Sequence, residues 1–367
     1  MGRKRARELG VVVGRYPAGR YNAITDVAGV RVGHKTVVRE DTPGVPGSRP
    51  VRTGVTTVWP GETPWRERVY AGTHVLNGYG EMIGIVHMGE WGLLHTPITL
   101  TSSLSIGVGY QAAAKWIARH DPDIESDTPM PVVAECDDGF LNDALSFPLA
   151  EQDVWDALDS ASTGPVAEGC VGAGTGMQCF DFKGGIGTAS RVLPAELGGF
   201  TIGALVLTNF GSRPDLLVKG IPVGQEITDL MPSSHSDGSA IGIVATDAPL
   251  LPHQLTRIAQ RAGLGLVRCG SIAENWSGEI LAAFSTAQTV PLAFTGNVLQ
   301  VSTVPDGATF ANTGIFNALF GATVESVEEA VLNALFMAET TVGRNGNTLH
   351  ALPIDRTLEL LERHGRL

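Results

Sequence analysis

The sequence contains few aromatic residues, scattered cysteines and none of the common metal-binding motifs. Aromatic residues make up 6% of the 367 residues, and the four cysteines form no C-x-x-C pair. In a chain of this size such cysteines indicate reduced thiols in or near the core, not a disulfide framework. The nine histidines show no H-E-x-x-H or comparable spacing. We therefore expect no metal ion and no other cofactor.

Positive charge and long apolar runs are also scarce. The net charge is −12, which argues against nucleic acid or an anionic membrane as the main partner. The one basic cluster, at residues 3–7, precedes an apolar run that Gly10 interrupts and that is too short for a secretory signal. We expect this cluster to be a solvated tail. No apolar stretch approaches membrane-spanning length, so a cytoplasmic protein without membrane or nucleic-acid partners is predicted.

Hydrophobic residues make up 43% of the chain, and 46 of its residues are glycine. This hydrophobic content is enough to form a large buried core without disulfide bonds or metal ions to stabilise it. The length alone leaves the number of domains open. Predicted strands and helices alternate too irregularly for a plain βαβ repeat, which favours a layered α/β sandwich of mixed sheets. The expected strands include 131–134, 201–208, 239–246 and 279–284, and the expected helices span about 106–119, 151–160, 253–262 and 326–339, the last capped by Ser326.

Motifs of several enzyme classes are missing or incomplete. No G-x-S-x-G elbow occurs, which argues against an α/β-hydrolase. The glycine-rich run 172–177 (GAGTGM) lacks the last glycine or alanine of a dinucleotide loop. His235, Ser236 and Asp237 carry the three side chains of a catalytic triad, but adjacent side chains of an extended segment point in opposite directions. We expect these three residues to belong to a polar loop.

The junction at Gly238 and Ser239 is the most informative local feature. The polar, turn-rich segment 211–238 passes directly into the apolar strand expected at 239–246. Glycine permits the strained backbone that a scissile bond needs. If the Gly238–Ser239 bond were cut, the new α-amine, with a pKa of about 7.7–8.0, could act as general base for the Ser239 hydroxyl. From these residues alone, an ordinary Gly-Ser turn before a strand remains an alternative.

Long motifs along most of the chain resemble the L-aminopeptidase/D-esterase family, which includes the β-aminopeptidases. The junction itself, GSAIGIVATDAPLLPHQL at 238–255, closely resembles the family's processing site. The other matching segments are YNAITDVAGVRVG at 21–33, NGYGEM at 77–82, PVVAECDDGFLND at 131–143, GAGTGMQCFDFKGGIGTASR at 172–191, 201–211, NWSGEILAAFSTA at 275–287 and 326–338.

This resemblance implies a fold and a maturation step. The fold is an α/β, four-layer αββα sandwich, similar to the N-terminal-nucleophile (Ntn) hydrolases and with the topology of the ornithine acetyltransferases. The chain would form one catalytic domain, 1–367, that cleaves itself between Gly238 and Ser239. The fragments 1–238 and 239–367 would stay together, and cleaved protomers would form a homo-oligomer.

The resemblance also implies roles for single residues. Ser239 matches the nucleophile, and Asn209 matches a side chain that helps to bind the oxyanion. Ser277 and Glu279 match a Ser-x-Glu pair that supports the nucleophile's amine and hydroxyl. Glu135 matches the carboxylate that binds the free amino group of a substrate. The residues are compatible with these roles, since Asn209 carries an amide donor and the two-residue spacing of Ser277 and Glu279 places them on one face of a strand.

One position departs from the family pattern. Where the family has a tyrosine two residues after the glutamate, this chain has Asp137, and we predict that Asp137 lines the substrate pocket. The predicted function is a self-processing aminopeptidase or amidase that acts on short peptides, amides or esters with a free amino group. The alternatives are an acyltransferase of the ornithine acetyltransferase type, which Ser239 in place of threonine disfavours, and an inactive, uncleaved binding protein.

Overall fold

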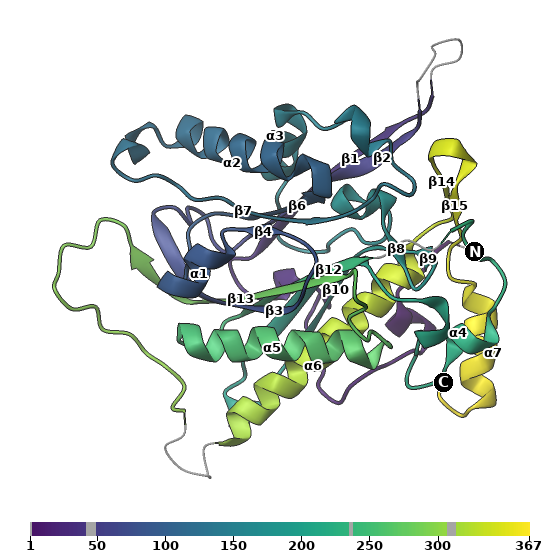
Figure 1. Cartoon of the computed structure of the whole chain (residues 1–367). Coiled ribbons are helices and arrows are strands. Elements are labelled where there is room, and N and C mark those ends of the chain that lie inside the picture. The colour runs from purple at the N-terminus through teal and green to yellow at the C-terminus, as the bar shows by residue number, and fades with distance from the viewer. Residues whose placement is uncertain (1, 42–48, 235–237, 307–312) are drawn as a thin grey trace.

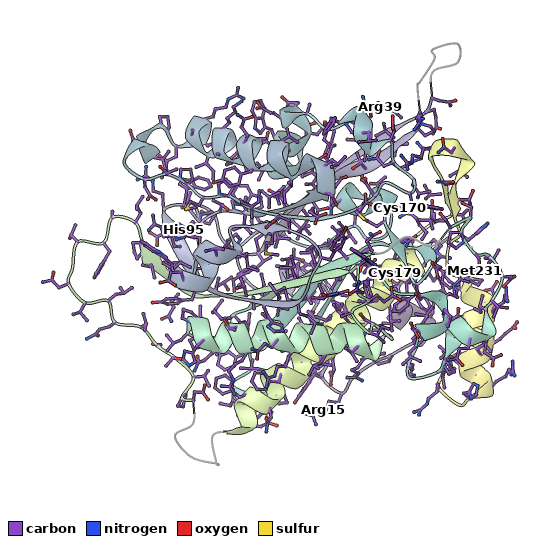
Figure 2. The ribbon with its side chains drawn as sticks, viewed as in Figure 1. Arg15, Arg39, His95, Cys170, Cys179 and Met231 are labelled. Carbon is purple, nitrogen blue, oxygen red and sulfur yellow. The ribbon has the colours of Figure 1, made fainter. Side chains whose placement is uncertain are left out.

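The computed structural model describes residues 2–41, 49–234, 238–306 and 313–367, and these form four layers, helix–sheet–sheet–helix (Figure 1). The layers are those that the family resemblance predicts. Side chains fill the space between the sheets, and Figure 2 shows them on the same view. His235, Ser236 and Asp237, predicted to form a polar loop, lie outside the described residues.

The first sheet has the strand order β1-β2-β6-β7-β4. Its β6–β7 pair is parallel, and the other pairs are antiparallel. Two helices, α2 and α3, cover its outer face (Figure 1). The bounds are β1 Arg31–Arg39, β2 Val51–Trp59, β4 Met82–Ile83, β6 Ile98–Ser102, β7 Val132–Cys136, α2 Ile106–His120 and α3 Glu151–Asp159.

The second sheet has the order β10-β11-β12-β13-β3-β5, with β12 and β13 parallel and the other pairs antiparallel. Helices α5 and α6 cover its outer face (Figure 1). The bounds are β3 Glu67–Gly78, β5 Leu93–Leu94, β10 Gly185–Val192, β11 Thr201–Asn209, β12 Ser239–Thr246, β13 Gly278–Pro291, α5 Pro252–Arg268 and α6 Thr313–Met337.

The central strands β11 and β12 are apolar on both faces. Leu205 and Ile241 pack into the core between the two sheets, whereas Val206 and Val244 pack into the core under the helices. Strands that are buried on both faces show continuous apolar runs in place of alternation. This explains the short, uninterrupted hydrophobic segments that the sequence shows at 201–208 and 239–246.

The remaining elements are short or lie at the periphery. They are α1 Ile85–Trp91, α4 Val223–Glu226, α7 Ile354–Arg363, the hairpin β8 Gln178–Cys179 with β9 Phe182–Lys183, and the hairpin β14 Thr341–Val342 with β15 Thr348–Leu349. Cys179 is buried and Cys170 is partly exposed (Figure 2), and all four cysteines are free thiols. In the described part of the chain, no helix is long and apolar enough to cross a membrane.

The predicted start of the last long helix is wrong. Ser326, expected as an N-cap, is fully buried in the interior of α6, which begins at Thr313. The helix extends upstream because Phe316, Leu319 and Ala322 bury apolar side chains at helical spacing in the core. Propensity and capping signals are local, and this tertiary burial outweighs them.

The basic cluster at residues 3–7 is also not the solvated tail that its composition suggests. Arg5 Nε lies 2.6 Å from Glu168, and an Arg7 guanidinium nitrogen lies 2.6 Å from Glu329 of α6. Glu329 also pairs with the buried Arg191 of β10 at 2.6 Å. The N-terminal segment is therefore tied to the helix layer behind the second sheet.

Candidate active site

Ser239 is the first residue of β12, in the middle of the second sheet. It pairs with Asn209, the last residue of β11, and on its other side with Gly278, the first residue of β13. Only 5% of Ser239 is exposed. The register therefore brings together three segments that are far apart in the sequence, and each carries a residue that the family resemblance selects.

Gly238 occupies a position where no other residue fits. A Cβ atom built on Gly238 would lie 2.0 Å from the backbone oxygen of Asn209 and 2.7 Å from the Cα of Phe210. Its carbonyl oxygen accepts a hydrogen bond from the backbone N–H of Gly278 at 3.2 Å. The carbonyl of the predicted scissile bond is thus held by a backbone donor at the start of β13, and the close approach of two backbones requires glycine.

The side chain of Asn209 presents an unpaired donor at this junction. Its Oδ1 accepts the backbone N–H of Gln178 at 3.0 Å. This bond orients the amide, because only its oxygen can accept a hydrogen bond from a backbone N–H. The Nδ2 group is buried and has no hydrogen-bond partner among the described residues. A buried donor left unpaired is costly, so this arrangement is suited to an oxyanion that forms only during reaction.

Ser277 and Glu279 lie on either side of Gly278 and contact each other. The Ser277 hydroxyl donates a short hydrogen bond to Oε1 of Glu279, as the two-residue spacing predicts. Both side chains are buried, and Glu279 pairs in register with Ala240 of β12 and Asn77 of β3. Burial raises the pKa of Glu279, against the lowering effect of the Ser277 hydrogen bond, and the charge of Glu274 raises it further.

Glu135 is buried near the end of β7, in the opposite sheet. Its Oε1 accepts the backbone N–H of Glu81 at 2.8 Å, and its Oε2 accepts a short hydrogen bond from the Ser103 hydroxyl. Burial raises the pKa of Glu135, these two hydrogen bonds lower it, and the charges of Asp137 and Glu81 raise it. The carboxylate is thus positioned by two donors, and no cation of the described residues forms an ion pair with it.

Cys136 follows Glu135 in β7 and lies near Ser239. Burial raises the pKa of its thiol well above the usual value, and the nearby Ser239 side chain and Ile241 backbone act in the opposite direction. Strands β7 and β12 contact each other across the two sheets, and Gly80 lies between Gly278 and the Glu135 carboxylate, so Glu135 lies near the junction. Cys136 was not selected from the sequence, because a lone cysteine without a partner motif resembles any core thiol.

Asp137 lies beyond the end of β7, which ends at Cys136. The strand alternation that would place Asp137 on the face of Glu135 therefore does not reach it. Asp137 is exposed, and its Oδ1 accepts the backbone N–H of Gly139 at 2.9 Å. The next residue, Asp138, is buried and accepts hydrogen bonds from Ser102 and Asn142 at 2.8 and 2.9 Å. Burial raises the pKa of Asp138 to about 6.

Three supporting residues were not predicted from the sequence: Gln178, Ser103 and Cys136. Gln178 lies in the glycine-rich segment 172–191, which the family resemblance includes, but only its backbone N–H acts on Asn209. No residue type could indicate such a backbone contact. Among the described residues, no group of three or more His, Cys, Asp or Glu side chains is placed to hold a metal ion.

The comparisons with known proteins identify the family of this site. The sequence pattern of peptidase family S58 matches residues 22–349. The chain belongs to peptidase family S58. A β-peptidyl aminopeptidase from Sphingosinicella microcystinivorans is 42% identical over 99% of this chain and 93% of its own. The L-aminopeptidase/D-Ala esterase/amidase from Ochrobactrum anthropi has a solved structure that is 42% identical, with a TM-score of 0.91 over 99% of both chains.

A second solved structure, a β-aminopeptidase from Burkholderia sp., is 41% identical with a TM-score of 0.89, again over 99% of both chains. The Ochrobactrum protein is described as a prototype of the serine aminopeptidases with a variant of the Ntn-hydrolase fold. The predicted family and the predicted Ntn-type αββα fold are therefore confirmed. This S58 member is a serine peptidase with aminopeptidase or amidase activity.

Proposed function

We propose that this S58 peptidase activates itself by cutting the Gly238–Ser239 bond and then uses the N-terminal Ser239 as nucleophile. Its substrates would be short peptides, amides or esters with a free amino group. The observation that carries the proposal is the junction itself. The Gly238 carbonyl accepts a hydrogen bond from the Gly278 N–H. Asn209, which pairs with Ser239, has a buried Nδ2 group without a hydrogen-bond partner in the described part of the chain.

Self-cleavage would begin with attack of the Ser239 hydroxyl on the Gly238 carbonyl carbon. The C–N bond breaks, the Ser239 nitrogen takes up the proton from the hydroxyl, and an ester joins Gly238 to Ser239. Water then hydrolyses this ester and leaves a carboxylate on Gly238 and a free α-amine on Ser239. Donors placed at the carbonyl oxygen before reaction would stabilise the charge that develops there.

In turnover the same hydroxyl would attack the substrate carbonyl. The α-amine of Ser239 accepts the hydroxyl proton and passes it to the leaving amine or alcohol, and water hydrolyses the acyl-enzyme. Asn209 Nδ2 donates to the oxyanion. Ser277 and Glu279 lie directly beside Gly278 at the same end of the sheet. We assign them to holding the amine and its proton.

The charge of the site supports an amine-bearing substrate. Besides burial, the charges of Asp137 and Glu81 raise the pKa of Glu135, and the charge of Glu274 raises the pKa of Glu279. All three are carboxylates. A buried carboxylate among like charges is stabilised when a cation binds to it. A substrate ammonium beside Glu135 would supply that cation, in a charge-assisted hydrogen bond.

The sheet itself explains how two fragments could stay together. After cleavage, fragment 239–367 would contribute β12 and β13, which lie side by side between β11 and β3 of fragment 1–238. Separating the fragments would break the β11–β12 and β13–β3 ladders and expose both faces of two buried strands. The homo-oligomeric state and the cytoplasmic location remain predictions.

The processing step is tested directly on a denaturing gel. We expect two pieces of roughly 25 and roughly 13.5 kDa, obtained by scaling the mass with residue number. N-terminal sequencing of the small piece is expected to give Ser-Ala-Ile-Gly. A purified, active preparation that remains a single full-length chain would contradict the proposed mechanism.

Recognition of the amine is tested with paired substrates. The wild type is expected to hydrolyse an amino-acid p-nitroanilide far faster than its N-acetyl form. Glu135→Gln should raise KM for the free-amine substrate, since it removes a charge-assisted contact of about 1.5–3 kcal/mol. Glu81→Gln is the matched control, because the backbone of Glu81 and not its side chain bonds to Glu135. Its effect should be smaller.

The same comparison has a pH-dependent component. Because burial raises the pKa of Glu135, KM for free-amine substrates should increase as the pH falls and the carboxylate becomes protonated. Glu135→Gln should remove this increase. Equal wild-type rates on the free and acetylated compounds would show that no amine is bound and would favour a general amidase.

A further inference from the structure

Two exposed aromatic side chains, Tyr79 and Trp276, lie beside the candidate active site. Their ring centroids are 5.1 Å apart and the ring planes meet at 84°. Tyr79 is 58% exposed and Trp276 is 53% exposed. Large aromatic side chains are usually buried, because burial removes a large apolar area from water. An exposed pair at the edge of a catalytic site therefore requires an explanation.

The backbone holds this pair against the site. Trp276 directly precedes Ser277, and a Cβ atom on Gly278 would lie 2.4 Å from the Tyr79 carbonyl oxygen. A Cβ atom on Gly80 would lie 3.3 Å from the Cα of Gly278 and 3.4 Å from Oε1 of Glu135. The Tyr79–Gly80 segment therefore fits between Glu135 and the first residue of β13. The backbone that carries Tyr79 thus lies beside Glu135, where the amino-terminal part of a substrate would bind.

Among the described residues, no cationic side chain stacks on either ring. Within the described residues, eight contacts place an arginine guanidinium over an aromatic ring. None of these rings is that of Tyr79 or Trp276. Asp137 is exposed and close enough for its charge to act on Glu135. Open aromatic faces beside a carboxylate form a surface that suits a cation on an apolar stem.

We propose that Tyr79, Trp276 and Asp137 bind the side chain of the substrate's N-terminal residue and favour a long basic side chain such as lysine. This inference rests on the proposed function, because it requires that Glu135 bind the α-ammonium. The methylene stem would pack on the rings, and the side-chain ammonium would lie near Asp137. Asp137 would thereby determine specificity at the position where the family has tyrosine.

The test compares two substrates that differ in the side-chain charge, lysine p-nitroanilide and norleucine p-nitroanilide. The wild type should have the higher kcat/KM on the lysine compound. Trp276→Leu keeps an apolar side chain but removes the ring, and it should lower the lysine-to-norleucine ratio by about 2- to 5-fold, the range of an exposed cation–π contact. Tyr79→Leu and Asp137→Asn should each lower the same ratio.

Two controls separate recognition from folding. Trp276→Phe retains an aromatic face and should restore part of the ratio. Trp91→Leu removes a tryptophan that is 62% exposed. Trp91 precedes Gly92, whose backbone oxygen bonds to Ala71, near the far end of β3 from Tyr79. Trp91→Leu should leave the ratio at the wild-type value.

The outcomes distinguish this inference from the proposed function. A wild-type preference for norleucine, or an unchanged ratio in Trp276→Leu, Tyr79→Leu and Asp137→Asn, would overturn the inference alone. Free-amine preference over acetylated compounds would still hold in that case. Failure to hydrolyse any free-amine p-nitroanilide would overturn the proposed function and this inference together.

Discussion

Ser239→Ala is expected to abolish both self-cleavage and turnover, and it has the largest effect that we predict. The same hydroxyl would attack the Gly238 carbonyl during processing and the substrate carbonyl during catalysis, so its removal stops both reactions. The variant should migrate as one full-length chain on a denaturing gel and should show no p-nitroanilide hydrolysis above background.

Two further variants make this experiment specific. Ser239→Cys and Ser239→Thr retain a nucleophilic atom at the same position and are expected to process slowly. Ser285→Ala removes another buried serine of the second sheet, whose hydroxyl donates to the Ala248 carbonyl at 2.6 Å. It should be cleaved normally. Efficient self-cleavage of Ser239→Ala would show that Ser239 is not the nucleophile.

Glu279→Gln should lower kcat by about 10²-fold or more while the protein remains folded. The substitution keeps the shape of the side chain and its ability to accept the Ser277 hydrogen bond, but it removes the negative charge. Positioned proton-transfer and electrostatic groups contribute effects of this size. The measurement is kcat on a free-amine p-nitroanilide, with a thermal melt to confirm folding.

Another buried carboxylate supplies the matched control. Burial raises the pKa of Glu328 in α6 to about 7, with Arg268 opposing that shift. Its carboxylate lies 2.8 Å from Arg268. Glu328→Gln makes the same chemical change away from the site, so it is expected to affect thermal stability more than turnover. If Glu279→Gln retained wild-type kinetics, Glu279 would have only a structural role.

Local patterns predicted the elements that carry the site. The strand expected at 239–246 is observed with the same bounds, and the helix expected at 151–160 is observed at Glu151–Asp159. The contact between Ser277 and Glu279 agrees with their two-residue spacing, although Ser277 itself precedes the first residue of β13. These features depend on periodicity within a few residues, which a sequence displays directly.

The sequence alone could not assign the functional roles. From the residues, Glu135 could have been a solvent-facing acid and Asn209 a turn residue, and only the resemblance of several long motifs selected them. The match of the S58 pattern over residues 22–349 confirms that resemblance. The individual roles of Ser239, Asn209, Ser277, Glu279, Glu135 and Asp137 stay predictions for the experiments above.

The sequence by itself determined the strand that begins at Ser239, the glycine before it, the acidic charge of the chain and the family motifs. Only the tertiary structure decided what surrounds that serine. Pairing β11 with β12 places Asn209 opposite Ser239, a backbone N–H of Gln178 orients the Asn209 amide, and packing of the two sheets brings β7, which carries Glu135, against β12. These contacts join residues that lie tens of positions apart in the sequence. They are determined by strand register and sheet packing, which no local pattern encodes.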